Sequence, residues 1–179
     1  EFKPIDVLIN NAGLALGRGK AYEADFDDWN TMIDVNVKAL THMTNLVLKD
    51  MAPEKKGHII NIGSVAGNWP YPGGHVYCAT KAFVQQFSLA LRADLYDTGI
   101  RVTNIEPGMV ETQFSLVRFK GNQGEANAVY ADTKPLKPED IAESVFWAAT
   151  LPPHVNINTL EIMPTAQAFS PLSVHRSNK

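Results

Sequence analysis

Residues 58–64 of the chain read HIINIGS, a short and largely apolar run that ends at Gly63 and Ser64. A run of this length between turn signals indicates a buried strand. Helical periodicity lies on either side of it, over residues 25–52 and about 76–97. Strands that alternate with helices in this way predict a parallel sheet covered by helices.

The rest of the chain continues this alternation. Asp25 is expected to cap the helix that precedes the central strand, and this helix is expected to end before Pro53. Residues 112–135 are polar and irregular, with weak helical content. The sequence contains no linker or internal repeat, so we expect one α/β domain over residues 1–179. Further strand and helix patterns occupy residues 5–9, 100–105, 138–151 and 159–163.

Composition limits the class of protein. Of 179 residues 45% are hydrophobic, the formal net charge is −3, and Cys78 is the single cysteine. Such a chain can bury one sizeable core, and it offers no basic surface for nucleic acid or membrane. A single cysteine fits a reducing cytosol. No apolar run in the sequence is long enough to span a bilayer. The histidines do not cluster with carboxylates at the spacings of metal ligands. We therefore expect a cytoplasmic protein with a small-molecule substrate and no metal.

A tyrosine and a lysine are spaced to act together. Tyr77 and Lys81 lie four residues apart in a predicted helix, so they share one face, and the ammonium can stabilise an ionised phenol. Ser64 ends the strand thirteen residues earlier, at the edge of the sheet where ligands of such folds bind. Its hydroxyl and the phenol can then converge on one substrate oxygen, although a serine that caps a turn is an equal interpretation.

Two other features are ambiguous when each is taken alone. Asn36 falls on the apolar stripe of its helix, where a buried amide needs partners. Bonding to backbone at a kink is the simpler interpretation, and a place in an active site is the alternative. Pro107 and Gly108 by themselves indicate only a turn after a strand.

Together these features form a known pattern. The set consists of Asn10-Asn11-Ala12-Gly13, the helical Asn36, Ser64, Tyr77-x-x-x-Lys81 and Pro107-Gly108. It resembles the short-chain dehydrogenase/reductase family over almost the whole chain. The resemblance implies a Rossmann-type doubly wound parallel sheet and an NAD(P)-dependent oxidoreductase that acts on an alcohol or its carbonyl.

The resemblance also implies a role for each catalytic position. Tyr77 is expected to be the general acid and base, with its pKa lowered from about 10 toward about 7 by the ammonium of Lys81. Lys81 is expected to hold the nicotinamide ribose as well. Ser64 is expected to orient the substrate oxygen. Asn36 is expected to hold a water that connects Lys81 to solvent.

Cofactor contacts follow from the same resemblance. Small residues of the first motif are expected against the adenosine-side ribose, and the loop after the third strand is expected along the nicotinamide. The expected cofactor-binding residues are Asn10, Ala12, Gly13, Tyr77, Lys81, Pro107, Gly108, Val110 and Thr112. The determinant that separates NAD from NADP would lie before Ile5, so the residues shown leave both cofactors open.

The chain departs from the family pattern at its start. The family opens with a strand, a Gly-rich turn and a helix whose N-terminus binds the pyrophosphate, and nothing of this kind precedes Ile5. Gly17-Arg18-Gly19 lacks the third glycine and cannot replace that turn. We therefore expect a C-terminal portion of the fold, without its first strands, and a natural protein that is longer by about 70 to 80 residues.

Substrate residues are expected in and near residues 112–135, the place of a substrate lid. Arg118 can bind a carboxylate through two parallel hydrogen bonds, and Trp69 is a candidate for the pocket wall; a solvated arginine and a packed tryptophan are the alternatives. Closer similarity, including residues 63–71 and 154–161, implies a homotetrameric subgroup that uses NADP to oxidise the 3-hydroxyl of short acids such as serine, allo-threonine or 3-hydroxypropionate. A reductase of non-acid carbonyls and a non-catalytic nucleotide-binding subunit are the other possibilities.

Overall fold

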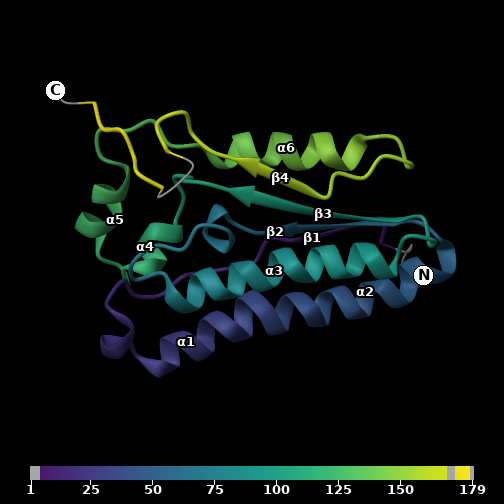
Figure 1. Ribbon diagram of the computed structural model, residues 1–179, viewed down its shortest axis with the longest axis horizontal. Helices are drawn as coiled ribbons and strands as arrows, with labels where there is room; N and C mark the ends of the chain where they lie inside the picture. The colour runs from purple at the N-terminus through teal and green to yellow at the C-terminus, as the bar shows by residue number, and fades with distance from the viewer. Residues whose placement is uncertain (1–4, 169–171, 178–179) are drawn as a thin grey trace.

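The computed structural model describes residues 5–168 and 172–177. Within them, four parallel strands form one sheet in the order β1-β2-β3-β4 (Figure 1). The predicted α/β class with a parallel sheet is confirmed. The strands are β1 (Val7–Asn10), β2 (Gly57–Ile62), β3 (Ile100–Pro107) and β4 (Thr159–Ile162).

Helices cover the two faces and one end of this sheet (Figure 1). On one face lie α1 (Phe26–Ile33), α2 (Leu40–Glu54) and α3 (His75–Asp94), and α6 (Pro138–Thr150) lies on the other. Two short helices, α4 (Phe114–Arg118) and α5 (Gln123–Tyr130), lie beyond the carboxyl ends of the strands. The expectation of an irregular segment over 112–135 is corrected here, because this segment contains two defined helices. The remaining helices are η1 (Ala21–Glu23), η2 (Asp34–Ala39) and η3 (Val65–Gly67).

The helix predicted from residue 25 forms one continuous helical run made of α1, η2 and α2. As predicted, Asp25 caps it, because its side chain accepts a hydrogen bond from the amide of Asp27. The expected end before Pro53 is wrong: α2 includes Pro53 and ends at Glu54. Proline is tolerated there because only one bond of the last turn is lost. The buried stripe consists of Met32, Asn36, Leu40, Thr44, Val47 and Met51.

A row of asparagines crosses the sheet near its carboxyl end. Asn10, Asn61 and Asn104 are direct neighbours in the strand register. Asn10 donates to Asn61 Oδ1 at 2.8 Å, and Asn61 donates to the hydroxyl of Ser88 on α3 at 2.9 Å. Both N–H groups of Asn10 are bonded inside the fold, whereas Asn104 Oδ1 is buried with no hydrogen-bond partner in the described residues. The bonds of Asn10 and Asn61 join the sheet to α3 just below the ends of the strands.

Strand β1 forms one edge of the sheet in the described residues. Its Val7 and Ile9 side chains are 39% and 47% exposed. None of the helices in the described part of the chain combines the length and apolar character needed to cross a membrane.

Candidate active site

Ser64 is placed by the turn that follows β2. The amide of Gly63 donates to the carbonyl of Ile105 at 2.7 Å, which extends the pairing of β2 with β3. Ser64 then caps η3, because its hydroxyl accepts from the amide of Ala66 at 3.1 Å. A side chain at Gly67 would lie 2.9 Å from the backbone of Lys81, so glycine allows this turn to pack directly on α3. Ser64 is thus both a turn cap and a residue of the strand-end site.

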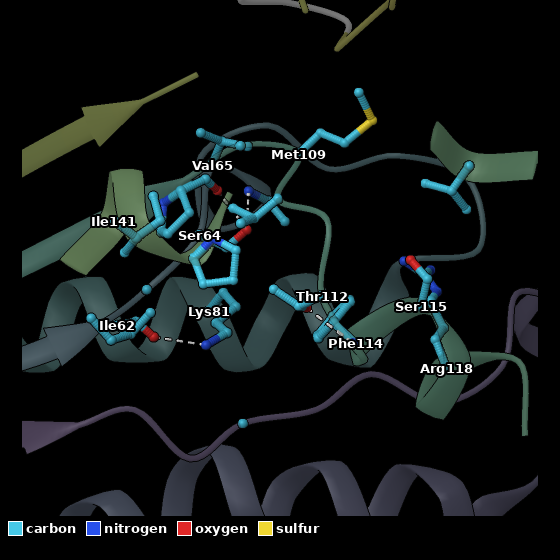
Figure 2. A pocket seen from close by; sticks show the side chains of 18 of the residues that line it. Ile62, Ser64, Val65, Lys81, Met109, Thr112, Phe114, Ser115, Arg118 and Ile141 are labelled. Atoms are coloured by element: carbon cyan, nitrogen blue, oxygen red, sulfur yellow. Dashed lines mark hydrogen bonds between the residues drawn. The ribbon is translucent and has the colours of Figure 1, made fainter. Parts of the chain in front are cut away.

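Tyr77 and Lys81 lie on the buried face of α3, with exposed fractions of 9% and 6%. The Tyr77 ring packs against Phe114 of α4, with the ring centroids 5.5 Å apart. The ammonium of Lys81 donates to the carbonyl of Ile62 at 2.8 Å (Figure 2) and lies 6.0 Å from the centroid of the Tyr77 ring. The helical spacing therefore brings the two groups together, although the ammonium points to the end of β2.

The pKa values of this pair differ from the expectation. Burial raises the pKa of Tyr77 above its usual range, and a hydrogen bond with Ser64 opposes this shift. Burial lowers the pKa of Lys81 to about 8. Lys81 alone therefore does not bring the phenol near pKa 7, and the further lowering expected from the positive charge of a bound nicotinamide stays a prediction. The expectation from the sequence included the Coulomb attraction between the Tyr77 phenolate and the Lys81 ammonium. It left out the cost of burying these two charged groups away from water.

Asn36 lies inside η2, a π-helical segment, and is 1% exposed. Its amide oxygen accepts from the amide of Leu14 at 2.9 Å. Its amide nitrogen donates to the carbonyl of Leu14 at 2.8 Å and to the hydroxyl of Thr80 at 3.1 Å. Both N–H groups are thus used, and Asn36 joins the loop after β1 to α3 beside the Tyr77 and Lys81 pair. The expected water relay stays a prediction.

A cavity of about 1640 Å³ opens beside these residues (Figure 2). Ser64, Tyr77 and Lys81 all line it, as do several expected cofactor-binding residues: Gly13, Pro107, Gly108, Val110 and Thr112. Asn10, Ala12 and Trp69 are not among its lining residues. Asn10 is 8% exposed, and its amide donates to Asn61 and Thr44, so its side chain is not available to a ribose. Trp69, expected in the pocket wall, does not line the cavity.

The cavity wall is largely apolar, and its charged part is cationic. Its lining includes four cationic side chains, and none of the aspartates and glutamates that the structure describes lines it. This contrasts with the formal net charge of −3 for the whole chain. A concave surface of one charge sign attracts ligands of the opposite sign. The four cations are Arg18, Lys81, Arg118 and Arg176.

Arg118 joins α4 to two loops from inside this cavity. Its Nε donates to the carbonyl of Gly17 at 3.2 Å, and its Nη2 donates to that of Gly73 at 3.4 Å. Its Nη1 donates to the phenol oxygen of Tyr71 at 2.7 Å. A guanidinium has five N–H groups, so these bonds leave two of them for a ligand.

Sequence reasoning did not find two residues of this wall. Arg18 was considered only as part of a failed Gly-rich motif, and Gln167 lies in a polar tail. For Arg176, in the same tail, a position over the site was one interpretation and a place on the surface the simpler one, and the structure places it in the wall. Gln167 accepts the amide of Met109 at 2.9 Å, which connects the tail to the loop after β3. Arg176 donates to the carbonyls of Val129 and Ala131 at the end of α5. No local pattern predicts these contacts, because the partners lie more than forty residues away.

The fold and the site define a class of protein: a parallel α/β sheet with Ser64 and the Tyr77 and Lys81 pair at the carboxyl ends of its strands. The family model for short chain dehydrogenase matches residues 1–122, and the chain belongs to this family. Over 178 residues it is 61% identical to the NADP-dependent 3-hydroxy acid dehydrogenase of Salmonella typhi, covering 99% of this chain and 72% of that protein. It is 54% identical over 176 residues to sulfoacetaldehyde reductase 2 of Chromohalobacter salexigens, covering 98% and 70%.

A solved structure gives the same result. The closed form of serine dehydrogenase complexed with NADP+ is similar with a TM-score of 0.93 and 59% identity, over 97% of this chain and 71% of that one. The resemblance that the sequence motifs implied is confirmed.

Proposed function

We propose that this protein is an NADP-dependent dehydrogenase that oxidises the 3-hydroxyl of a short hydroxy acid and reduces the matching semialdehyde. Serine, allo-threonine and 3-hydroxypropionate are the candidate acids. One observation carries the proposal: Ser64, Tyr77 and Lys81 open into a cavity whose charged lining, within the described residues, is wholly cationic. Both NADP and a short acid are anions, so one basic cavity serves both.

The residues present fit a nicotinamide cofactor. In the loop after β3, the amides of Gly108, Met109 and Glu111 are bonded to other parts of the chain. The amide of Val110 has no such partner in the described residues, and Val110 lines the cavity. An amide without a partner beside a cavity suits a carboxamide oxygen. The lining residues that would hold the cofactor are Gly13, Tyr77, Lys81, Pro107, Gly108, Val110 and Thr112, and Ala12 would do so from beside the cavity.

The protein's own groups would supply orientation and protons. The bound nicotinamide supplies or accepts the hydride. Ser64 would hold the substrate oxygen, and Tyr77 would take the hydroxyl proton on oxidation and return it on reduction. Lys81 has two N–H groups beyond its bond to Ile62, and these would hold ribose hydroxyls. Asn36 would keep the loop after β1 against α3 and hold the relay water through its remaining acceptor lone pair.

Residues 112–135 would form the substrate lid, with Arg118 as the anchor for the acid. Arg118 keeps two N–H groups and lines the same cavity as Tyr77. A planar guanidinium suits a carboxylate. A sulfonate, the acid group of the substrate named for the Chromohalobacter relative, presents similar oxygens and is the second candidate.

The direct test is absorbance at the reduced-nicotinamide band with a panel of substrates. We expect turnover with NADP and the three hydroxy acids, and in reverse with malonic semialdehyde. The panel also includes sulfoacetaldehyde, which tests a sulfonate in place of the carboxylate, and propanal, which tests an aldehyde without an acid group. Faster turnover of propanal would favour a carbonyl reductase. Cofactor binding without any turnover would favour a non-catalytic subunit.

Arg118→Ala is expected to raise KM for malonic semialdehyde about 10- to 100-fold relative to KM for propanal, because a lost charge-assisted bond is worth about 1.5 to 3 kcal/mol. Steady-state kinetics with both aldehydes measure this ratio. Lys120→Ala is the matched control, since Lys120 pairs with Asp28 at 2.8 Å and is not part of the cavity lining. An unchanged ratio in Arg118→Ala would assign Arg118 to loop packing alone.

We also propose a cytoplasmic homotetramer assembled through α2 and α3. Apolar side chains on the outer faces of these helices support this, because monomers rarely expose contiguous patches of this kind. Phe83 stacks on Phe87 with the ring centroids 5.6 Å apart. Phe87 is half-buried, and the exposed apolar residues there are Phe83, Met43, Leu46 and Leu89.

A further inference from the structure

A buried acid lies next to the catalytic turn. Glu106 is the second-last residue of β3, directly before Pro107, and is 1% exposed. Its Oε2 accepts from the side-chain amide of Asn68 at 2.8 Å, and its Oε1 accepts from that of Asn104 at 2.7 Å. Glu106 is not among the residues that line the cavity, so it has no part in the chemistry described above.

The contact with Asn68 joins two pieces of the site. Asn68 caps the C-terminus of η3, the one-turn helix that Ser64 caps at the other end. Glu106 is followed at once by the Pro107 and Gly108 loop, and the Ser64 hydroxyl lies 3.4 Å from the carbonyl of Pro107. One carboxylate thus connects the far end of the Ser64 turn to the strand that carries the nicotinamide loop.

Burial of the Glu106 carboxylate at this position costs free energy. Burial raises the pKa of Glu106, two amide donors oppose the shift, and Glu161 on β4 adds to it. Glu161 is the direct neighbour of Glu106 in the strand register, and like charges side by side on adjacent strands are unfavourable. An apolar side chain would fill the same space without these costs, but it could not bond to Asn68.

We propose that Glu106 is a positioning residue: by holding Asn68, it keeps the Ser64 hydroxyl in register with Tyr77 and the Pro107 loop. It acts through Ser64 and does not touch substrate or cofactor. This role rests on the dehydrogenase function proposed above. A displacement of about 1 Å at a catalytic group can reduce turnover up to about a hundredfold, so a residue outside the cavity can still control the rate.

The experiment compares three variants of the whole protein. Asn68→Ala removes the bond and keeps the backbone cap of η3, and we expect kcat to fall about tenfold with KM for NADP unchanged. E106Q is expected to keep most of kcat. The side-chain amide of Asn68 can flip, so that its oxygen accepts a hydrogen bond from the side-chain nitrogen of the new glutamine. The double variant Asn68→Ala with E106Q should be no slower than Asn68→Ala alone. Thr103→Val is the matched control, since it removes a buried bond from the same strand, to His58 at 2.8 Å, away from Ser64.

A second readout separates positioning from general loss of structure. The bond from Ser64 lowers the pKa of Tyr77, so a displaced Ser64 should move the pH profile of kcat/KM for oxidation upward by about half a unit or more. The other titratable groups that face Tyr77 are Tyr71, Cys78 and Arg118 and Lys81, whose ammonium lies 6.0 Å from the ring centroid; all four are unchanged in Asn68→Ala. Thr103→Val should lose stability without this shift.

Amide hydrogen exchange tests the positioning role of Glu106 without any measurement of activity. Amides of residues 63–68 should exchange faster in Asn68→Ala than in wild type or Thr103→Val. If wild type has no turnover, the proposed function fails while exchange still decides the role of Glu106. If wild type turns over, but Asn68→Ala matches Thr103→Val in kcat, pH profile and exchange, the positioning role is overturned.

Discussion

Replacing Tyr77 by phenylalanine is expected to lower kcat by about a thousandfold or more while NADP binding changes less than about twofold, because general acid–base groups contribute about 10² to 10⁴ in rate. The ring is buried and packs against Phe114, and phenylalanine keeps that packing. Only the hydroxyl and its hydrogen bond with Ser64 are lost. Stopped-flow or steady-state absorbance gives kcat, and titration of protein fluorescence gives the affinity for NADP.

Tyr71→Phe is the matched comparison for this variant. Its phenol also lines the cavity and is bonded to Arg118, so this variant should affect KM for the acid more than kcat. An equal loss of kcat and of NADP affinity in Tyr77→Phe would make Tyr77 structural and would remove the acid–base role.

Lys81→Met is expected to act in opposite directions on activity and stability. Turnover should fall by about a hundredfold or more, because the charge beside the phenol and the proposed ribose donors are lost. The free energy of unfolding at pH 7 should rise by about 2 kcal/mol. Removing a buried ammonium whose pKa is lowered to about 8 stabilises the folded state by about 3 kcal/mol, and losing its hydrogen bond to Ile62 costs about 1 kcal/mol. Urea denaturation monitored by fluorescence measures the change.

The pH dependence supplies the control. Burial lowers the pKa of Lys81 from 10.5 to about 8, so the unfolded chain binds more protons between these values. The stability contributed by this group therefore rises with pH from about 8 to 10.5. The gain of Lys81→Met over wild type should shrink over this window, vanish before pH 10.5 and become a small loss above it, because the lost bond to Ile62 remains. A gain in the free energy of unfolding that does not depend on pH would show that burial of the Lys81 ammonium does not destabilise the folded state.

Local patterns predicted the elements well, and they failed where packing decided a boundary. Alternation of strand and helix signals gave the parallel sheet, and the cap at Asp25 follows from a single side chain. Pro53 does not end α2, since the last turn can lose one bond. Ile33 and Met43 belong to an apolar helical spacing, yet both are exposed, because one side of this helix remains open to solvent.

The candidate site shows the same division. Ser64, Tyr77 and Lys81 were found by their spacing, since a strand end and one helix face determine where such residues lie. Asn10 was expected at the cofactor and instead bonds to Thr44 and Asn61. Arg176, from the tail, contributes to the cavity wall. These outcomes depend on partners that lie far away along the chain.

The sequence by itself determined the order of the strands and helices, the family and the three residues at the end of β2 and on α3, because periodicity and short spacings act within one or two elements. The tertiary structure alone decided the direction of the pKa shifts of Tyr77 and Lys81, the four cations in the cavity wall and the hydrogen bond between Glu106 and Asn68. Burial and pairing of charges depend on how distant segments pack against one another, and no local pattern encodes that.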